Sequence, residues 1–244
     1  MSDKIKITID GNEVEATKGE NLIDVCRRIG IDIPSLCDHD DLTPYGSCRL
    51  CMVEWDRGDW SKMITSCNFP IKEGQVFKTN SEKVIRQRKM IMEWTLARAS
   101  KTPEILDLAK RIGVDVDKVR FSKKDEGCIL CGMCIRACEE VVGASAISFS
   151  NRGPERKVSS PFGEEAHDCI GCGSCAYVCP TNYIEMKEDD NTREFPLWNV
   201  KFEFAKCKKC GRKIAPKKQI EFILKKVKLP EGWFDYCQDC REIK

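Results

Sequence analysis

The chain has 244 residues, with 41 lysines and arginines against 39 aspartates and glutamates, so its formal net charge is +2. This balance argues against the basic footprint of a nucleic-acid-binding protein. No run of 18 apolar residues occurs and no apolar export signal follows Met1, so we expect no membrane span and a cytoplasmic location. The 17 cysteines are the outlier, and their C-x-x-C grouping favours metal ligation over disulfides.

The first predicted domain covers residues 1–80. Isoleucines alternate with polar residues over 4–10, and the turn signal Asp10-Gly11-Asn12 leads into a second alternating segment, which predicts a hairpin. Residues 20–29 carry apolar side chains at helical spacing, and Gly30 ends the helix. A hairpin followed by a crossing helix predicts a β-grasp domain in an α+β chain.

A group of four cysteines follows this predicted helix: Cys37, Cys48, Cys51 and Cys67. Ten, two and fifteen residues separate them, a pattern close to plant-type 2Fe–2S ligation although the first gap is longer. Gly46 and Ser47 would let the backbone approach the cluster and donate hydrogen bonds. A four-thiolate zinc site is the competing interpretation. Cys26 lies on the apolar side of the predicted helix, where we expect a buried, inert thiol.

A helical connector is predicted over residues 81–120. Residues 81–99 have a helical apolar pattern with Ser81 as the N-cap, and Thr102-Pro103 begins a second short helix. The Met and Trp side chains of the first helix are interpreted as packing residues.

Residues 121–190 form the predicted paired-cluster domain, because they hold two C-x2-C-x2-C-x3-C runs. In such pairs the fourth cysteine of each run ligates the other cluster. One predicted 4Fe–4S ligand set is therefore Cys128, Cys131, Cys134 and Cys179, and the second is Cys169, Cys172, Cys175 and Cys138. Structural zinc is the alternative. A short strand is expected after each run, over 146–149 and 183–186, and the charges of Glu139 and Glu140 would make reduction of a nearby cluster harder unless solvent screens them.

The tail, residues 200–244, holds two further C-x2-C pairs separated by 26 residues: Cys207, Cys210, Cys237 and Cys240. Between them, apolar residues from Ile220 to Val227 predict one helix beginning near Pro216. Two such pairs are typical of a four-cysteine zinc ribbon, in which the metal replaces a hydrophobic core. A further iron–sulfur cluster is the alternative.

The motifs CDHDDLTPYGSCRLCMVEW, CILCGMCIRACEE and CIGCGSCAYVCPT resemble the large iron–sulfur subunit of NADH dehydrogenase. The same part occurs in iron–sulfur subunits of NAD(P)-linked hydrogenases and formate dehydrogenases, and the resemblance covers about residues 3–187. It implies a hetero-oligomer with a flavin-containing NAD(P)H-oxidising subunit, a small 2Fe–2S subunit, hydrogenase subunits and ferredoxin as partners. One family feature is missing, because no His or Cys lies between Cys67 and Cys128 to hold the cluster expected there.

The sequence thus predicts an electron-transfer subunit of a cytoplasmic multi-subunit hydrogenase, the electron-bifurcating type included. The sequence contains no pairing of a nucleophile with a general base and no glycine-rich nucleotide-binding motif, so we expect no catalytic residues on this chain alone. The alternatives are the equivalent subunit of an NAD-linked formate dehydrogenase, a free-standing multi-cluster ferredoxin, and a zinc-ribbon regulatory protein. Both the terminal catalytic subunit and the choice between NAD and NADP stay open.

Overall fold

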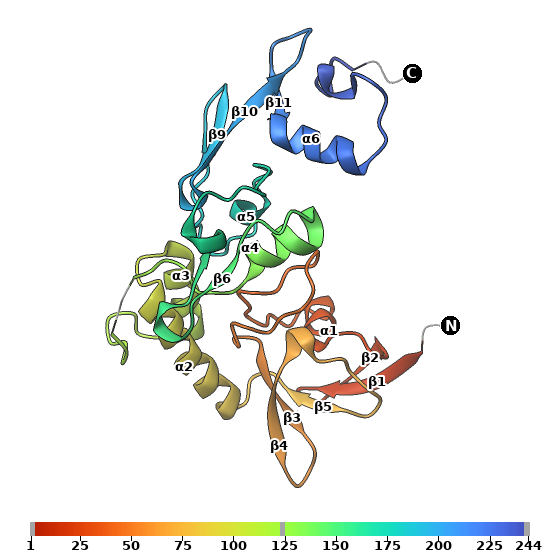
Figure 1. Cartoon of the computed structure of the whole chain (residues 1–244). Coiled ribbons are helices and arrows are strands. Elements are labelled where there is room, and N and C mark those ends of the chain that lie inside the picture. Colours follow the sequence, from red (N-terminus) through yellow and green to blue (C-terminus); the bar gives the residue numbers. More distant parts are fainter. Residues whose placement is uncertain (1–2, 123–124, 242–244) are drawn as a thin grey trace. The chain divides into compact units, whose positions relative to one another are not determined.

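The computed structural model describes residues 3–122 and 125–241. The chain divides into two compact units, Met1–Cys131 and Gly132–Lys244 (Figure 1). Both mix helices and strands. Short 3₁₀ turns connect several of the elements; they span Ser66–Asn68, Gly153–Glu155, Pro161–Gly163, Pro196–Trp198 and Trp233–Asp235.

A five-stranded sheet forms the base of the first unit. Its strands are β1 (Lys4–Ile9), β2 (Asn12–Thr17), β3 (Met52–Asp56), β4 (Ser61–Thr65) and β5 (Val76–Lys78). They lie in the order β2-β1-β5-β3-β4, with β1 and β5 parallel and the other neighbours antiparallel. The predicted hairpin is present, since Ile9 pairs with Asn12 across Asp10 and Gly11, both of which have positive φ as a two-residue turn requires.

Helix α1 (Leu22–Arg28) packs its apolar side against this sheet. Leu22, Ile23 and Val25 are at most 1% exposed and share one apolar core with the isoleucines of β1. Cys26 is fully buried in the same core, and burial raises the pKa of its thiol to about 12. The predicted burial of this thiol is therefore confirmed.

Two helices form the rest of the first unit. Helix α2 (Glu82–Arg98) begins at Ser81, whose Oγ accepts a hydrogen bond from Val84 N at 3.4 Å, and α3 (Pro103–Ile112) has its proline in the first turn and ends at Gly113 in the left-handed conformation. Both predicted helices are confirmed. They enclose a second apolar core that includes Leu50 and Met52, next to the cysteine loop.

Glu54 in β3 is a buried carboxylate bound by several donors. Lys83 Nζ lies 2.9 Å from its Oε1 and 2.8 Å from Ser61 Oγ. Hydrogen bonds with Ser61, Ser81 and Lys83 lower the pKa of Glu54 from 4.5 to about 2. Because the folded pKa is depressed, the ionised group stabilises the fold fully above pH about 4.5, and this contribution is lost as the pH falls toward 2.

We expect Glu54→Gln to lower the free energy of unfolding at pH 7 by about 2 kcal/mol. The difference in the free energy of unfolding between the variant and the wild type should become smaller when the pH is lowered to about 4. At that pH Glu54 begins to bind a proton in the unfolded chain only. The midpoint of urea unfolding, followed by tryptophan fluorescence, measures both effects. Glu13→Gln, in an exposed pair with Lys6, is the control and should change stability little. A stability difference between Glu54→Gln and the wild type that is absent at pH 7, or equal at both pH values, would contradict the stabilising role of the ionised Glu54.

The second unit begins with short elements around the cysteine runs. Helix α4 (Met133–Arg136) continues into a π-helical turn, Ala137–Val142, and α5 (Ser174–Tyr177) lies inside the second run. Strands β6 (Ser148–Ser150) and β7 (Lys157–Ser159) form an antiparallel pair after the first run. The strand expected over 146–149 is therefore present, but it begins at Ser148 and ends at Ser150.

A four-stranded antiparallel sheet follows the second run. It comprises β8 (Lys187–Glu188), β9 (Thr192–Phe195), β10 (Val200–Lys206) and β11 (Lys213–Pro216) in the order β11-β10-β9-β8, and α6 (Lys217–Lys226) packs against β10 and β11. The strand predicted at 183–186 is wrong: these residues are irregular, and pairing begins at Lys187 because its partner is β9. The predicted tail helix is confirmed as α6, with Pro216 at its N-cap.

Among the described residues, no helix is both long enough and apolar enough to cross a membrane.

Candidate functional site

The four cysteines of the first unit converge at the edge of its core. Cys37 lies in the loop after α1, Cys48 and Cys51 precede β3, and Cys67 lies in the 3₁₀ turn after β4. Cys37, Cys51 and Cys67 are at most 1% exposed, and Cys48 is partly buried. Folding therefore brings three thiols of the long connection between α1 and β3 together with the thiol of the turn after β4, in one buried site.

Hydrogen bonds show how close these sulfurs are. The backbone N–H of Cys48 donates to Cys37 Sγ at 3.4 Å, and that of Leu36 donates to Cys48 Sγ at 3.4 Å. The Cys48 and Cys67 thiols donate to Cys37 and hold the pKa of that thiol below its usual range. Four convergent thiols with backbone N–H groups aimed at sulfur are the chemistry that a 2Fe–2S cluster needs.

Gly46 and Ser47 shape the loop between the first two ligands. Gly46 has φ +69°, and a Cβ there would lie 2.9 Å from Asn68 Nδ2, so only glycine fits between this loop and the turn that holds Cys67. Ser47 Oγ donates to the backbone oxygen of Cys131 at 3.1 Å. The same unit thus brings the first cysteine group against the start of the next run.

Other contacts in the first unit fix that start. Arg98 Nε donates to the backbone oxygen of Cys128 at 3.1 Å, and Ile129 packs against the same core as Cys48. A cavity of about 490 Å³, bordered by Cys48, Trp94 and Ile129 among others, opens beside them. Cys131 and Cys134 are buried and Cys128 is partly buried. The beginning of the first run is therefore tied to the helix α2 and to the Ser47 loop.

Within the second unit, Cys138 lies near the cysteines of the second run. Burial raises the pKa of Cys138, Cys169 and Cys175, and the charges of Cys172 and Cys138 act on the other thiols in the same direction. Ala146 N donates to Cys138 Sγ at 3.3 Å from the loop after the π-helical turn. Cys179 is partly buried, and its Sγ lies 3.6 Å from Thr181 Oγ1.

A hairpin that the sequence reasoning missed supports the second run. From β9, Arg193 Nη1 donates to the backbone oxygens of Gly171 and Cys172, at 2.7 and 3.2 Å. The Phe202 ring, on β10, packs against Gly171: a Cβ atom at Gly171 would lie only 2.6 Å from the ring, so a larger residue would clash. Trp198, in the turn between the strands, is fully buried. The apolar alternation of residues 200, 202 and 204 was a signal for β10 that the prediction did not use.

The tail cysteines form a compact four-sulfur group. The sulfurs of Cys207, Cys210, Cys237 and Cys240 all lie within 4.8 Å of one another. Arg212 donates to Cys210 Sγ at 3.5 Å and to Cys237 Sγ at 3.6 Å, and its guanidinium also donates to Asp239 at 2.7 Å. Hydrogen bonds with backbone N–H groups lower the pKa of Cys207 to about 6. Four convergent thiols, one of them acidic, suit a metal ion.

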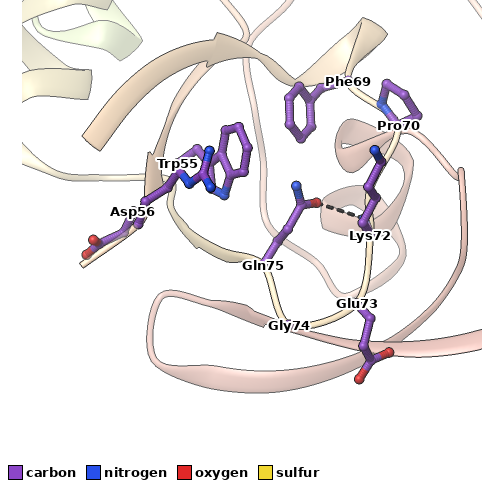
Figure 2. A pocket seen from close by; sticks show the side chains of 9 residues that line it. Trp55, Asp56, Phe69, Pro70, Lys72, Glu73, Gly74 and Gln75 are labelled. Atoms are coloured by element: carbon purple, nitrogen blue, oxygen red, sulfur yellow. Dashed lines mark hydrogen bonds between the residues drawn. The ribbon is translucent and has the colours of Figure 1, made fainter. Parts of the chain in front are cut away.

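One further cavity, of about 610 Å³, lies on the first unit beyond Cys67 (Figure 2). Trp55 and Phe69 line it with ring centroids 5.3 Å apart, and Gln75 accepts a hydrogen bond from Lys72 N at 2.8 Å. Its described lining residues include charged side chains but no cysteine or histidine.

Domain families match most of the chain. Residues 2–82 match a family described as a 2Fe-2S iron-sulfur cluster binding domain, and residues 123–186 match a 4Fe-4S dicluster domain. A second 4Fe-4S dicluster family matches residues 168–215, so this match extends over Cys207 and Cys210.

Curated relatives include components of large oxidoreductases. The chain is 30% identical over 206 residues to the alpha subunit of NADPH-Fe(3+) oxidoreductase from Geobacter sulfurreducens, and the alignment covers 75% of this chain and 24% of that protein. It is 28% identical over 206 residues to a subunit of NADH-quinone oxidoreductase from Rickettsia bellii, covering 75% of this chain and 30% of that protein. The chain thus spans less than a third of the length of these relatives.

A solved structure shares the fold. A chain in the crystal structure of an NAD+-reducing NiFe-hydrogenase in the H2-reduced state superposes with a TM-score of 0.64 at 22% identity. The superposition covers 80% of this chain and 89% of that chain.

Proposed function

We propose that this chain, an iron–sulfur protein homologous to subunits of NADH-quinone oxidoreductase and NADPH-Fe(3+) oxidoreductase, is the electron-transfer subunit of a cytoplasmic multi-subunit hydrogenase. It would relay electrons between a flavin/NAD(P)H subunit and a catalytic metal subunit or ferredoxin, with electron bifurcation as one form of the reaction. The observation that carries this proposal is the succession of a 2Fe–2S domain and a 4Fe–4S dicluster domain in one homologous chain.

The residues that would hold the clusters are the cysteines of the three groups. The convergence of Cys37, Cys48, Cys51 and Cys67 supports their assignment to the 2Fe–2S cluster. The mutual influence of Cys138, Cys169, Cys172 and Cys175 supports one 4Fe–4S set. The other set, Cys128, Cys131, Cys134 and Cys179, rests on the cysteine spacing. When bound, the clusters supply one-electron transfer, and the chain positions and insulates them.

Of the two ways to replace the cluster that is missing between these groups, a direct route or a partner's cluster, we propose the direct route. Within the first unit, the hydrogen bond from Ser47 to the backbone of Cys131 holds the 2Fe–2S ligand loop against Cys131, the second cysteine of the first 4Fe–4S run. This contact favours electron transfer between those two groups without a partner's cluster. The 2Fe–2S side would then face the flavoprotein, and the 4Fe–4S pair would face the hydrogenase subunits or ferredoxin.

For the tail we propose zinc. A tetrahedral ion with Zn–S bonds of about 2.3 Å holds its sulfurs about 3.8 Å apart. The Cys210 and Cys237 sulfurs are 3.6 Å apart, and all four are within 4.8 Å, which suits one ion. The cysteines of a 4Fe–4S cluster bind four different irons, so their sulfurs would lie farther apart. The dicluster-family match over Cys207 and Cys210 is the observation that favours iron.

The finer fold assignments follow from the same elements. The parallel pairing of β1 with β5 and the packing of α1 on the sheet support a β-grasp domain. The two runs, with α4 and α5 inside them, support a bacterial-type two-cluster ferredoxin domain. The β10–β11 hairpin with its cysteine pair supports a zinc-ribbon-like tail.

Purification of the native complex through an affinity tag on this chain tests the function. We expect a flavoprotein and a nickel-containing subunit to co-purify, and hydrogen-dependent reduction of a viologen dye. Molybdenum or tungsten with formate-dependent reduction would instead assign the chain to an NAD-linked formate dehydrogenase. An iron-loaded monomer without partners by size exclusion would overturn the subunit role and leave a free-standing ferredoxin.

A further inference from the structure

Trp198 carries the largest fully buried side chain of the described part of the chain. Its indole N–H makes no regular hydrogen bond with any described residue. Leaving a buried donor unsatisfied is unfavourable, and such groups are rare unless something binds them. We therefore expect the indole N–H of Trp198 to have a hydrogen-bond acceptor in the functional, cluster-loaded protein.

The sulfur of Cys175 is the acceptor available to this N–H. Burial raises the pKa of Cys175 to about 12, and donation from the Trp198 side chain acts in the opposite direction. The Trp198 side chain is therefore a neighbour of this sulfur. A thiolate that binds iron accepts an N–H hydrogen bond far better than a neutral thiol, because it carries negative charge.

The backbone holds Trp198 firmly in this place. Its carbonyl oxygen accepts a hydrogen bond from Ala166 N at 3.1 Å, and the carbonyl of Ala166 accepts one from Cys169 N at 2.9 Å. On the neighbouring strand, Arg193 binds the carbonyls of Gly171 and Cys172 while Glu188 holds its guanidinium at 2.7 Å. The hairpin and the cysteine loop are therefore fixed to each other at several points on either side of the indole.

We propose that Trp198 sets the reduction potential of the 4Fe–4S cluster on Cys169, Cys172, Cys175 and Cys138 by donating its indole N–H to the Cys175 sulfur. This inference rests on the proposed function, since it requires the cluster. A hydrogen bond to a ligating sulfur stabilises the reduced, more negative state and makes the potential more positive. Trp198 is a positioning residue, since it acts on the cluster through Cys175.

The test is Trp198→Phe in the full, cluster-loaded chain, with potentials measured by EPR-monitored redox titration. The change removes the N–H and keeps an aromatic ring. We expect one of the two 4Fe–4S reductions to become about tenfold less favourable, a shift of about 59 mV to more negative values for a one-electron couple. The 2Fe–2S potential in the same sample should not move. Trp60→Phe, at a half-exposed tryptophan of the first unit, is the matched control and should leave the 2Fe–2S and both 4Fe–4S potentials unchanged.

The outcomes separate this inference from the proposed function. A wild-type chain without 4Fe–4S signals would refute the function itself. Full cluster content with unchanged 4Fe–4S potentials in Trp198→Phe would refute only the role of Trp198. If the phenylalanine variant loses iron, replacement of Trp198 by β-(3-benzothienyl)alanine retains the shape of the indole and lacks only the N–H. The same negative shift in that variant supports the proposal, and no shift overturns it.

Discussion

Replacement of Cys37 by alanine is expected to remove the 2Fe–2S cluster and to lower the iron content from about ten to about eight per chain. Cys37 is fully buried, and two neighbouring thiols donate to its sulfur. Its loss leaves three thiols, which cannot complete the coordination of two irons. Iron and acid-labile sulfide analysis with EPR of the reduced protein measures the change.

Cys26→Ala is the matched control for this experiment. Cys26 is equally buried in the same domain, and it lies in the apolar core on α1. The variant should keep all its iron and its 2Fe–2S signal. Loss of the signal in both variants would mean that the domain tolerates no change in its core, and an unchanged signal in Cys37→Ala would remove Cys37 from the ligand set.

Replacement of Cys237 by serine is expected to abolish metal binding in the tail while the iron content stays near ten. The expected loss is about one zinc per chain. Cys237 is buried and lies 3.6 Å from Cys210, so the remaining three thiols lose the fourth corner of the site. Because a structural zinc contributes folding free energy directly, residues from β11 onward should become sensitive to limited proteolysis.

Elemental analysis of the wild type and the variant decides the identity of this metal. About fourteen irons and no zinc in the wild type would replace the zinc proposal by a fourth cluster. Asp239→Asn, which weakens the exposed pair with Arg212 and leaves every thiol in place, is the control and should retain the metal. Equal metal content in wild type and Cys237→Ser would show that Cys237 is no ligand.

Local signals in the sequence were sufficient for most of the first unit. Asp10 and Gly11 specify their turn by positive φ, Ser81 caps α2 through its own side chain, and Pro103 begins α3. Each of these depends on residues within one turn of the chain. The gathering of the tail cysteines was also predictable, because two C-x2-C pairs have few uses other than metal binding.

The hairpin around the second run was not predictable in the same way. The strand expected at 183–186 begins instead at Lys187, since its position depends on pairing with β9. The hydrogen bonds of Arg193 with the Gly171 and Cys172 carbonyls join residues about twenty positions apart. No periodicity encodes such contacts, so they become visible only when the sheet is formed.

Arg212 has a consequence for the chemical durability of the tail. Four thiolates around a divalent ion leave an excess of two negative charges, and electron-rich sulfurs of this kind react with peroxides and alkylating agents. The guanidinium of Arg212 donates hydrogen bonds to two of these sulfurs. It withdraws electron density from them through a planar fork of donors that a lysine, with its single nitrogen, would match less well. The tail metal should therefore resist oxidative release.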